Sequence, residues 1–213
     1  MLPAAHLGKL ARRARSNVAR FRARATTVCF GATSAETRVQ LAHITTGLLN
    51  TWTEFSRAYY LSCLLRPKRS KGGIVTVTFS GKRFEDAIAA VMQRFKPYIY
   101  NAGRWSRRDE PAWHDLATFV PACTALGCSN LADIQAAVSV PTKVFQDLPV
   151  FRNFFCHRNQ STMEACARIA LTHYGIVAPH PCEMLKASAV RRPAPLLIDW
   201  IDDMDTVVEW LCE

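Results

Sequence analysis

Residues 41–59, "LAHITTGLLNTWTEFSRAY", carry the pattern that decides the fold. Large apolar side chains recur at steps of three or four residues, at Leu41, Ile44, Leu48, Trp52, Phe55 and Tyr59. This spacing places them on one face of an α-helix. Just upstream, Thr33 and Glu36 have the spacing of a capping box. The sequence therefore predicts a long, mostly buried helix that ends near Leu65.

The flanking segments repeat this helical spacing. Residues 4–25 set apolar positions against a face of arginines, which predicts a long, basic, amphipathic helix that could lie on RNA. At the other end, Pro195 precedes an apolar stripe that predicts a final helix. A capping box at Ser161 and Glu164 predicts the start of a further helix, which Gly175 ends. Other helical segments are expected at residues 84–100, 112–126 and 130–140.

Only residues 74–79, "IVTVTF", have a convincing β pattern, and one strand does not make a sheet. We therefore predict an all-α helical bundle with at most one short strand or hairpin. Residues 1–28 are expected to form a basic helical arm, and residues 29–213 the helical domain.

The composition is that of a folded globular protein, with 49% apolar and 21% charged residues in a chain of 213. No apolar run reaches the roughly 20 residues needed to span a bilayer, and the start lacks the apolar block of a secretory signal. We expect a cytoplasmic protein that does not enter the membrane. The Arg-rich start, with no acid before Glu36, is also typical of a mitochondrial transit peptide.

The eight cysteines are scattered and form no C-x-x-C pair, so we interpret them as reduced core residues. A zinc site built from Cys123 and Cys128 with His173, His180 or Cys182 fits no standard ligand spacing. The sequence therefore predicts no bound metal ion and no other cofactor.

The charge distribution favours a polyanionic partner. The net charge is +10, with seven basic residues and no acid in residues 1–28 and six acids and no base in residues 196–213. The middle of the chain is therefore basic on its own, which favours RNA or DNA first and an anionic membrane second. The alternative is a solvated surface whose two oppositely charged ends attract each other.

Residues 150–159, "VFRNFFCHRN", combine a core-like run with three polar side chains. On a helix, Asn153 and His157 lie on one face because they are four residues apart, and Arg152 lies beside them. A histidine transfers protons near neutral pH, and a planar guanidinium can stabilise a crowded phosphorus centre. The set suits the cleavage of a phosphodiester without a metal ion.

Residues 152–157 resemble the R-polar-x3-H signature of the HEPN-domain ribonucleases, which are small α-helical proteins common among bacterial toxins and antiviral effectors. The resemblance implies metal-independent RNA cleavage that leaves a 2′,3′-cyclic phosphate. It also implies a homodimer in which two copies of the motif line one cleft. Arg152 and His157 would take the roles of the family's arginine and histidine, and Asn153 would orient them. An antitoxin or another regulatory protein is a further expected partner.

Other residues are candidates for binding RNA. Lys143 and Arg158 flank the motif and could hold the RNA backbone. In "GRWSRR", residues 103–108, a base could stack on Trp105 while three arginines hold phosphates, namely Arg104, Arg107 and Arg108. The alternative functions are a non-catalytic nucleic-acid-binding module and a protein-interaction module whose acidic last helix docks on a basic partner.

Overall fold

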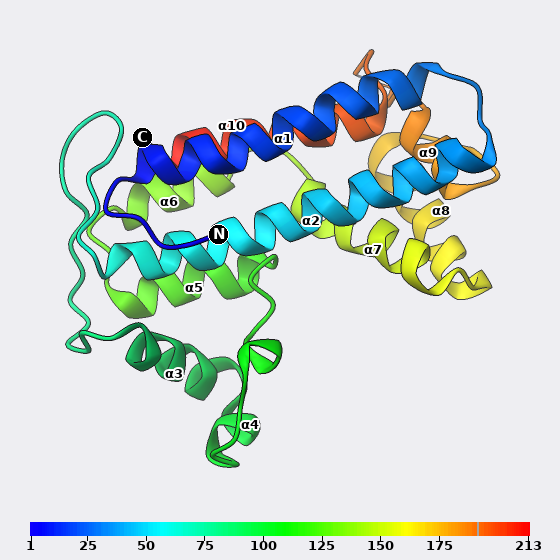
Figure 1. The fold of residues 1–213 in the computed structure, drawn as a ribbon. Coiled ribbons are helices and arrows are strands. Elements are labelled where there is room, and N and C mark those ends of the chain that lie inside the picture. The colour runs from blue at the N-terminus through cyan, green and yellow to red at the C-terminus, as the bar shows by residue number, and fades with distance from the viewer. Residues whose placement is uncertain (191) are drawn as a thin grey trace. The chain divides into compact units, whose positions relative to one another are not determined.

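The computed structural model describes residues 1–190 and 192–213, and the all-α prediction is confirmed for them: they form ten α-helices, a short 3₁₀ turn and no sheet (Figure 1). None of these helices is long and apolar enough to cross a lipid bilayer. The elements are α1 (Leu7–Phe30), α2 (Ala35–Cys63), α3 (Phe84–Phe95), α4 (Pro97–Asn101), η1 (Arg107–Asp109), α5 (Leu116–Leu126), α6 (Leu131–Val138), α7 (Val144–His157), α8 (Gln160–Tyr174), α9 (Pro181–Lys186) and α10 (Leu196–Cys212).

The chain divides into two compact units, and three long helices, α1, α2 and α10, contribute residues to both. The first unit consists of Met1–Ala14, Trp52–Val140 and Val207–Glu213. The second unit consists of Arg15–Thr51 and Pro141–Thr206. The helix expected as an arm at residues 1–28 is α1, and its apolar stripe, from Leu7 to Val28, is buried except for the half-buried Phe21.

The first unit is built on the aromatic residues of α2. Trp52 and Tyr59 are fully buried, and each packs edge-on against the ring of Phe119 from α5, with centroids 6.1 and 5.7 Å apart. The hydroxyl of Tyr59 accepts a hydrogen bond of 2.8 Å from the Asn130 amide. Burial of large aromatic rings is the main stabilising term of such a core, and it explains why this stretch of the sequence organises the unit.

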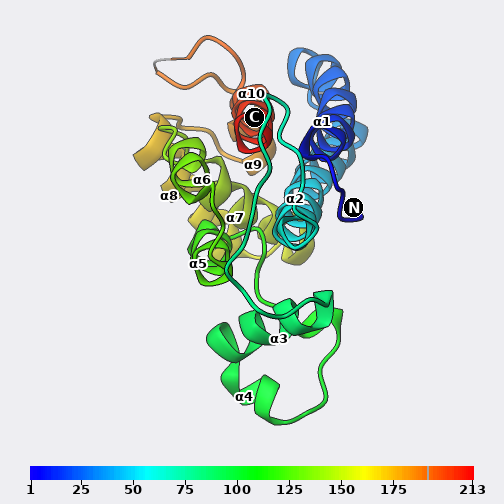
Figure 2. The ribbon, with the colours of Figure 1, turned by 90° about the vertical axis from the view of Figure 1, so that its left-hand side faces the viewer.

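The second unit places α7 against α8, and α8 against α9 (Figure 1; Figure 2 gives the same ribbon turned by 90°). Its core is centred on Trp200 of α10, which is 1% exposed. The ring of Phe151 from α7 meets Trp200 edge-on at 5.2 Å, and Tyr174 from α8 meets it at 5.9 Å. The helix that carries the R-polar-x3-H sequence is therefore anchored to the core through its apolar face.

Two predicted helix starts were wrong, each by one or two residues. The side chain that caps α2 is Ser34, whose hydroxyl accepts from the Thr37 amide at 3.1 Å, and not Thr33. The side chain that caps α8 is Asn159, which accepts from the Thr162 amide at 2.9 Å, and not Ser161. Both capping pairs were identified from spacing, but several neighbouring polar residues could cap these helices equally well.

Two other segments differ from the prediction in detail. The helix expected at residues 84–100 is divided into α3 and α4, because Pro97 lacks the amide hydrogen that would continue α3. The expected strand at residues 74–79 forms only isolated bridges, at Ile74 and Val77. These bridges pair with separate segments, so no ladder develops.

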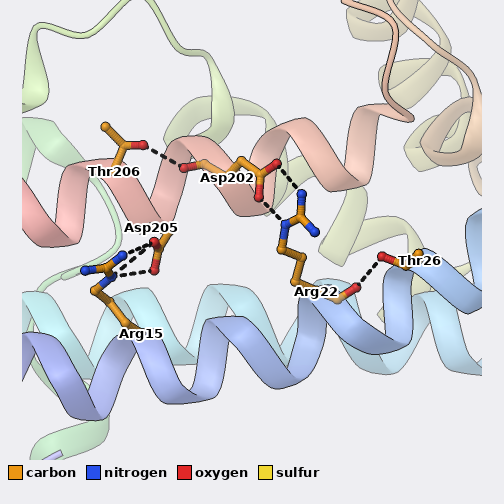
Figure 3. Close-up of polar contacts among 6 residues, drawn as sticks. All are labelled: Arg15, Arg22, Thr26, Asp202, Asp205 and Thr206. Carbon is orange, nitrogen blue, oxygen red and sulfur yellow. Dashed lines mark hydrogen bonds and ion pairs between the residues drawn. The ribbon is translucent and has the colours of Figure 1, made fainter.

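Ion pairs join α1 to α10 within the second unit (Figure 3). The guanidinium of Arg15 makes a paired contact with the Asp205 carboxylate, at 2.8 and 2.9 Å, and Arg22 holds Asp202 in the same way. Two of the seven basic residues near the N-terminus are therefore occupied by the acidic last helix. Oppositely charged chain ends do attract each other here.

We expect Asp205→Asn to lower the free energy of unfolding by about 0.5–1 kcal/mol, since exposed ion pairs contribute little even with good geometry. The side chains of Arg15 and Asp205 are 39% and 30% exposed, so salt should screen their attraction. Urea unfolding at low and at high salt would measure this. An effect of the same size at both salt concentrations would contradict the prediction.

Gly127, which ends α5 with φ +68°, should not tolerate a side chain. A Cβ atom there would lie 1.9 Å from Oγ1 of Thr78 and 3.2 Å from its backbone nitrogen. We expect Gly127→Ala to lower the free energy of unfolding by about 2 kcal/mol or more, because a left-handed backbone and a steric clash add together. Thermal unfolding would show this, with Gly103→Ala, where no atom lies within 4 Å, isolating the backbone effect.

Candidate functional site

Helix α7 presents one polar face to the surface and buries the rest. Its buried side chains include Leu148, Phe151, Phe154 and Phe155, which surround the helix axis except on one side. The helix ends at His157. The open side is therefore the only part of α7 on which polar residues can meet a ligand.

The three motif residues, Arg152, Asn153 and His157, lie on or beside this open side. Asn153 and His157 are exposed, one helical turn apart, and Arg152 is half-buried at the edge. Five residues of helix turn by about 140° and rise by about 7.5 Å, so Arg152 and His157 occupy opposite edges of the strip. Asn153 lies between them. We call these three residues the α7 motif.

The Nε atom of the Arg152 guanidinium has no partner among the described residues. This atom is also buried. A buried donor without an acceptor costs about 1–3 kcal/mol. The Nε atom has almost no accessible surface, so an oxyanion from outside the chain would have to bind through the outer edge of this half-buried guanidinium.

A cavity of about 520 Å³ opens beside the end of α7, within the second unit. It lies between α7, the start of α2 and the residues around the start of α9. Its lining residues are Thr33, Ser34, Ala35, Arg38, Val39, Phe154, Phe155, Arg158, His180 and Cys182. We call it the Arg38 cavity. It contains Arg158, one of the residues expected to bind RNA.

His180 is held as a neutral hydrogen-bond donor in this cavity. Its Nδ1 atom accepts from the Cys182 amide at 3.1 Å, so the neutral ring carries its proton on Nε2. Burial lowers the pKa of His180, and the guanidiniums of Arg38 and Arg158 lower it further, while the Glu183 carboxylate acts in the opposite direction. The imidazole can therefore donate to a ligand without being charged.

Lys143 lies far from the α7 motif. It precedes α7, whereas the motif lies at the end of this helix of 14 residues, about 20 Å long. Lys143 lines another cavity, of about 480 Å³, together with His173 and Arg192. Arg158 therefore lies at the same end of α7 as the motif, and Lys143 lies at the opposite end.

A buried carboxylate holds α7 in place. Asp147 is 1% exposed, and its Oδ2 atom lies 2.8 Å from Nδ1 of His173 and accepts from the Tyr174 hydroxyl at 2.7 Å. Tyr174 in turn accepts from the indole of Trp200 at 2.9 Å. This network joins α7 to α8 and α10. Its hydrogen bonds are all formed when the three helices keep this relative position, so the network specifies how they pack.

The four candidates of residues 103–108 belong to the first unit. Arg107 is paired with Glu54, and Trp105 is half-buried. Arg104 and Arg108 are exposed. An RNA bound here would meet two exposed arginines, while Arg107 would have to leave its carboxylate.

The cysteines are distributed between the two units. Cys123 and Cys128 lie in the first unit beside Cys63. Hydrogen bonds with the thiols of Cys123 and Cys63 lower the pKa of Cys128. The three other residues considered for zinc, His173, His180 and Cys182, lie in the second unit. Within residues 1–190 and 192–213, no three His, Cys, Asp or Glu side chains are placed to bind a metal ion together.

Sequence reasoning missed three residues of this region: Arg38, His180 as a cavity residue, and Asp147. Asp147 was recognisable as a lone acid in the apolar run "VFQDLPVF", where an unpaired charge would be costly. Arg38 carried no local signal, because its importance comes from a cavity formed by distant segments.

Comparisons with protein-family models, with curated proteins and with solved structures found no match for this chain. The resemblance to HEPN ribonucleases therefore rests on the residues of the α7 motif.

Proposed function

We propose that this protein is a metal-independent endoribonuclease of the HEPN type that acts as a homodimer in the cytoplasm. One observation carries the proposal: the α7 motif combines an exposed imidazole and amide with a half-buried guanidinium at the edge of the same face of α7. These groups cover the chemistry of RNA cleavage, which needs proton transfer and stabilisation of charge at phosphorus.

The reaction is an internal displacement at the phosphate. One copy of His157 takes the proton of the ribose 2′-hydroxyl, and the 2′-oxygen then attacks the phosphorus. The bond from phosphorus to the 5′-oxygen breaks, and that oxygen leaves with a proton donated by a second imidazole. Arg152 stabilises the negative charge on the equatorial oxygens. The products are a 2′,3′-cyclic phosphate and a 5′-hydroxyl.

A homodimer supplies what one chain lacks. Base and acid act on opposite sides of the phosphorus, and the α7 motif offers one histidine per chain. A second copy across a cleft provides the other imidazole. It also allows Arg152 of one copy to meet a phosphate near His157 of the other, although the two residues occupy opposite edges of one helix.

The test is incubation of the purified protein with RNA in EDTA, with analysis of the product ends. We expect cleavage without added metal and 2′,3′-cyclic phosphate termini. Products with 3′-hydroxyl ends, or cleavage only with a divalent metal, would contradict the proposed reaction.

A second candidate function is nucleic-acid binding without cleavage. It is favoured by the basic charge and by Arg38 and Arg158, which form no ion pair in the part of the chain that the structure describes. It predicts salt-sensitive binding to RNA or DNA, which a gel-shift titration would measure. Binding that is equal at low and high salt would count against this function.

As a nuclease, the protein would act as a toxin or antiviral effector and would need a regulatory partner. Expression of the wild type and of His157→Ala in a host, scored by growth, would show whether the activity is toxic.

Docking of α10 on a basic partner is not favoured, because Asp202, Asp203 and Asp205 already pair with arginines of the same chain.

A further inference from the structure

We infer that the Arg38 cavity is a binding site for a backbone phosphate of an RNA strand, next to the scissile phosphate. Because this strand is the substrate of the proposed nuclease, the inference rests on the proposed function. It adds Arg38, His180 and the start of α2 to the substrate-binding surface, none of which belongs to the α7 motif.

The cavity has the size and access that a phosphodiester needs. Its volume is about 520 Å³, and Ser34, Arg38 and Arg158 at its edge are exposed. The buried rings of Phe154 and Phe155 form part of its wall. An anion can therefore enter from solvent and meet the guanidiniums beside an apolar surface, where electrostatic attraction is stronger than in water.

The charge around the cavity is mainly positive. Burial raises the pKa of the Cys182 thiol, in the cavity wall, to about 11, and Arg38 acts against this rise. Arg158 and Lys186 also lower the pKa of Cys182, whereas Glu183 raises it. Three cationic side chains therefore act on the wall at Cys182 against one carboxylate, and Glu36 adds a further acid in the first turn of α2.

The charge of Lys186 is available as well, because its ammonium contacts neutral oxygens and forms no ion pair within residues 1–190 and 192–213. It donates to the Gly31 carbonyl at 2.7 Å and to the Thr33 hydroxyl at 2.8 Å. These bonds fix the loop between α1 and α2 at the rim of the cavity. A phosphate would thus meet a fixed wall instead of a loop that must first be ordered.

The His180 ring and the backbone around the cavity are held in place before a ligand arrives. Arg158 has a left-handed backbone, with φ 44°, which costs a non-glycine residue about 1 kcal/mol and is common at functional sites. The ring of His180 lies edge-on to Phe154, with centroids 5.3 Å apart and planes at 82°. Ser34 caps α2, so the positive end of a 29-residue helix also points to this region.

The cavity also has the right relation to the α7 motif. Arg158 follows His157 directly in the chain, so the proton-transfer group and the phosphate-binding group belong to the same end of α7. A strand that places one phosphate in the cavity would bring a neighbouring phosphodiester to His157. A single-stranded RNA is therefore a better ligand than a free nucleotide, which offers no second phosphodiester.

The experiment measures binding without cleavage. A fluorescent 2′-O-methyl oligoribonucleotide, which cannot be cleaved by its own 2′-oxygen, is titrated by anisotropy with wild type, Arg38→Gln and Arg158→Gln. We expect each variant to bind about tenfold more weakly, with a salt slope smaller by about 1, as for the loss of one charged phosphate contact. Arg168→Gln removes an exposed arginine of the same unit, outside the cavity lining, and should bind as the wild type does.

Equal affinity of Arg38→Gln, Arg158→Gln and the wild type would overturn the inference. Binding of inorganic phosphate or AMP as tight as that of the oligonucleotide would overturn the assignment of an RNA strand as the ligand. The nuclease is tested separately: if unmodified RNA stays intact but oligonucleotide binding still depends on Arg38, the cleavage proposal fails and the phosphate site stands.

Discussion

His157→Ala should slow the cleavage of RNA in EDTA by about 10²–10⁴-fold, because proton transfer by a positioned side chain contributes this much. The imidazole is exposed at the end of α7, so its removal opens no cavity in the core. The fold and its stability should therefore stay unchanged. Initial rates on a fluorogenic RNA, together with a thermal unfolding curve, measure both quantities.

Cys156→Ser is the matched control for this variant, because Cys156 is exposed and adjacent to His157. It should cleave at the rate of the wild type. Arg152→Lys keeps the positive charge but loses the planar pair of donors, and we expect it to lose much of the activity as well. Equal rates for the wild type and His157→Ala would exclude His157 from the chemistry.

Asp147→Ala should lower the free energy of unfolding by about 3 kcal/mol or more, since hydrogen bonds to a buried carboxylate contribute about 1.5–3 kcal/mol each. The substitution leaves the half-buried Tyr174 hydroxyl and the partly exposed His173 ring without their shared acceptor, at a position where Asp147 itself is buried. Urea unfolding at neutral pH measures the loss. Since Asp147 belongs to α7, the same variant should also disturb the α7 motif.

Two further variants make this prediction specific. Tyr174→Phe removes one hydroxyl from the network and should cost about 1 kcal/mol, less than the loss of the carboxylate. Glu164→Ala removes an exposed acid from α8 and should change the stability by less than about 0.5 kcal/mol. A loss for Asp147→Ala as small as that for Glu164→Ala would show that the network does not hold α7 in place.

The helices were predictable because their signal is local. Apolar residues three and four positions apart identified α1, α2 and α10, and Gly175 marked the end of α8. Capping residues were less predictable, because their choice depends on neighbours in space. Thr33 has the right chemistry to cap α2, but its hydroxyl accepts from Lys186, which lies far along the chain, and Ser34 is the cap instead.

The sequence by itself determined the all-α class and the alignment of Asn153 with His157 on one face of a helix, because both follow from the geometry of a single helix. It also determined the excess of positive charge. Only the tertiary structure decided which cations remain available. Distant segments pair Arg15 and Arg22 with α10, whereas Arg38 and Arg158 meet at one cavity, and such contacts depend on how helices pack and not on local spacing.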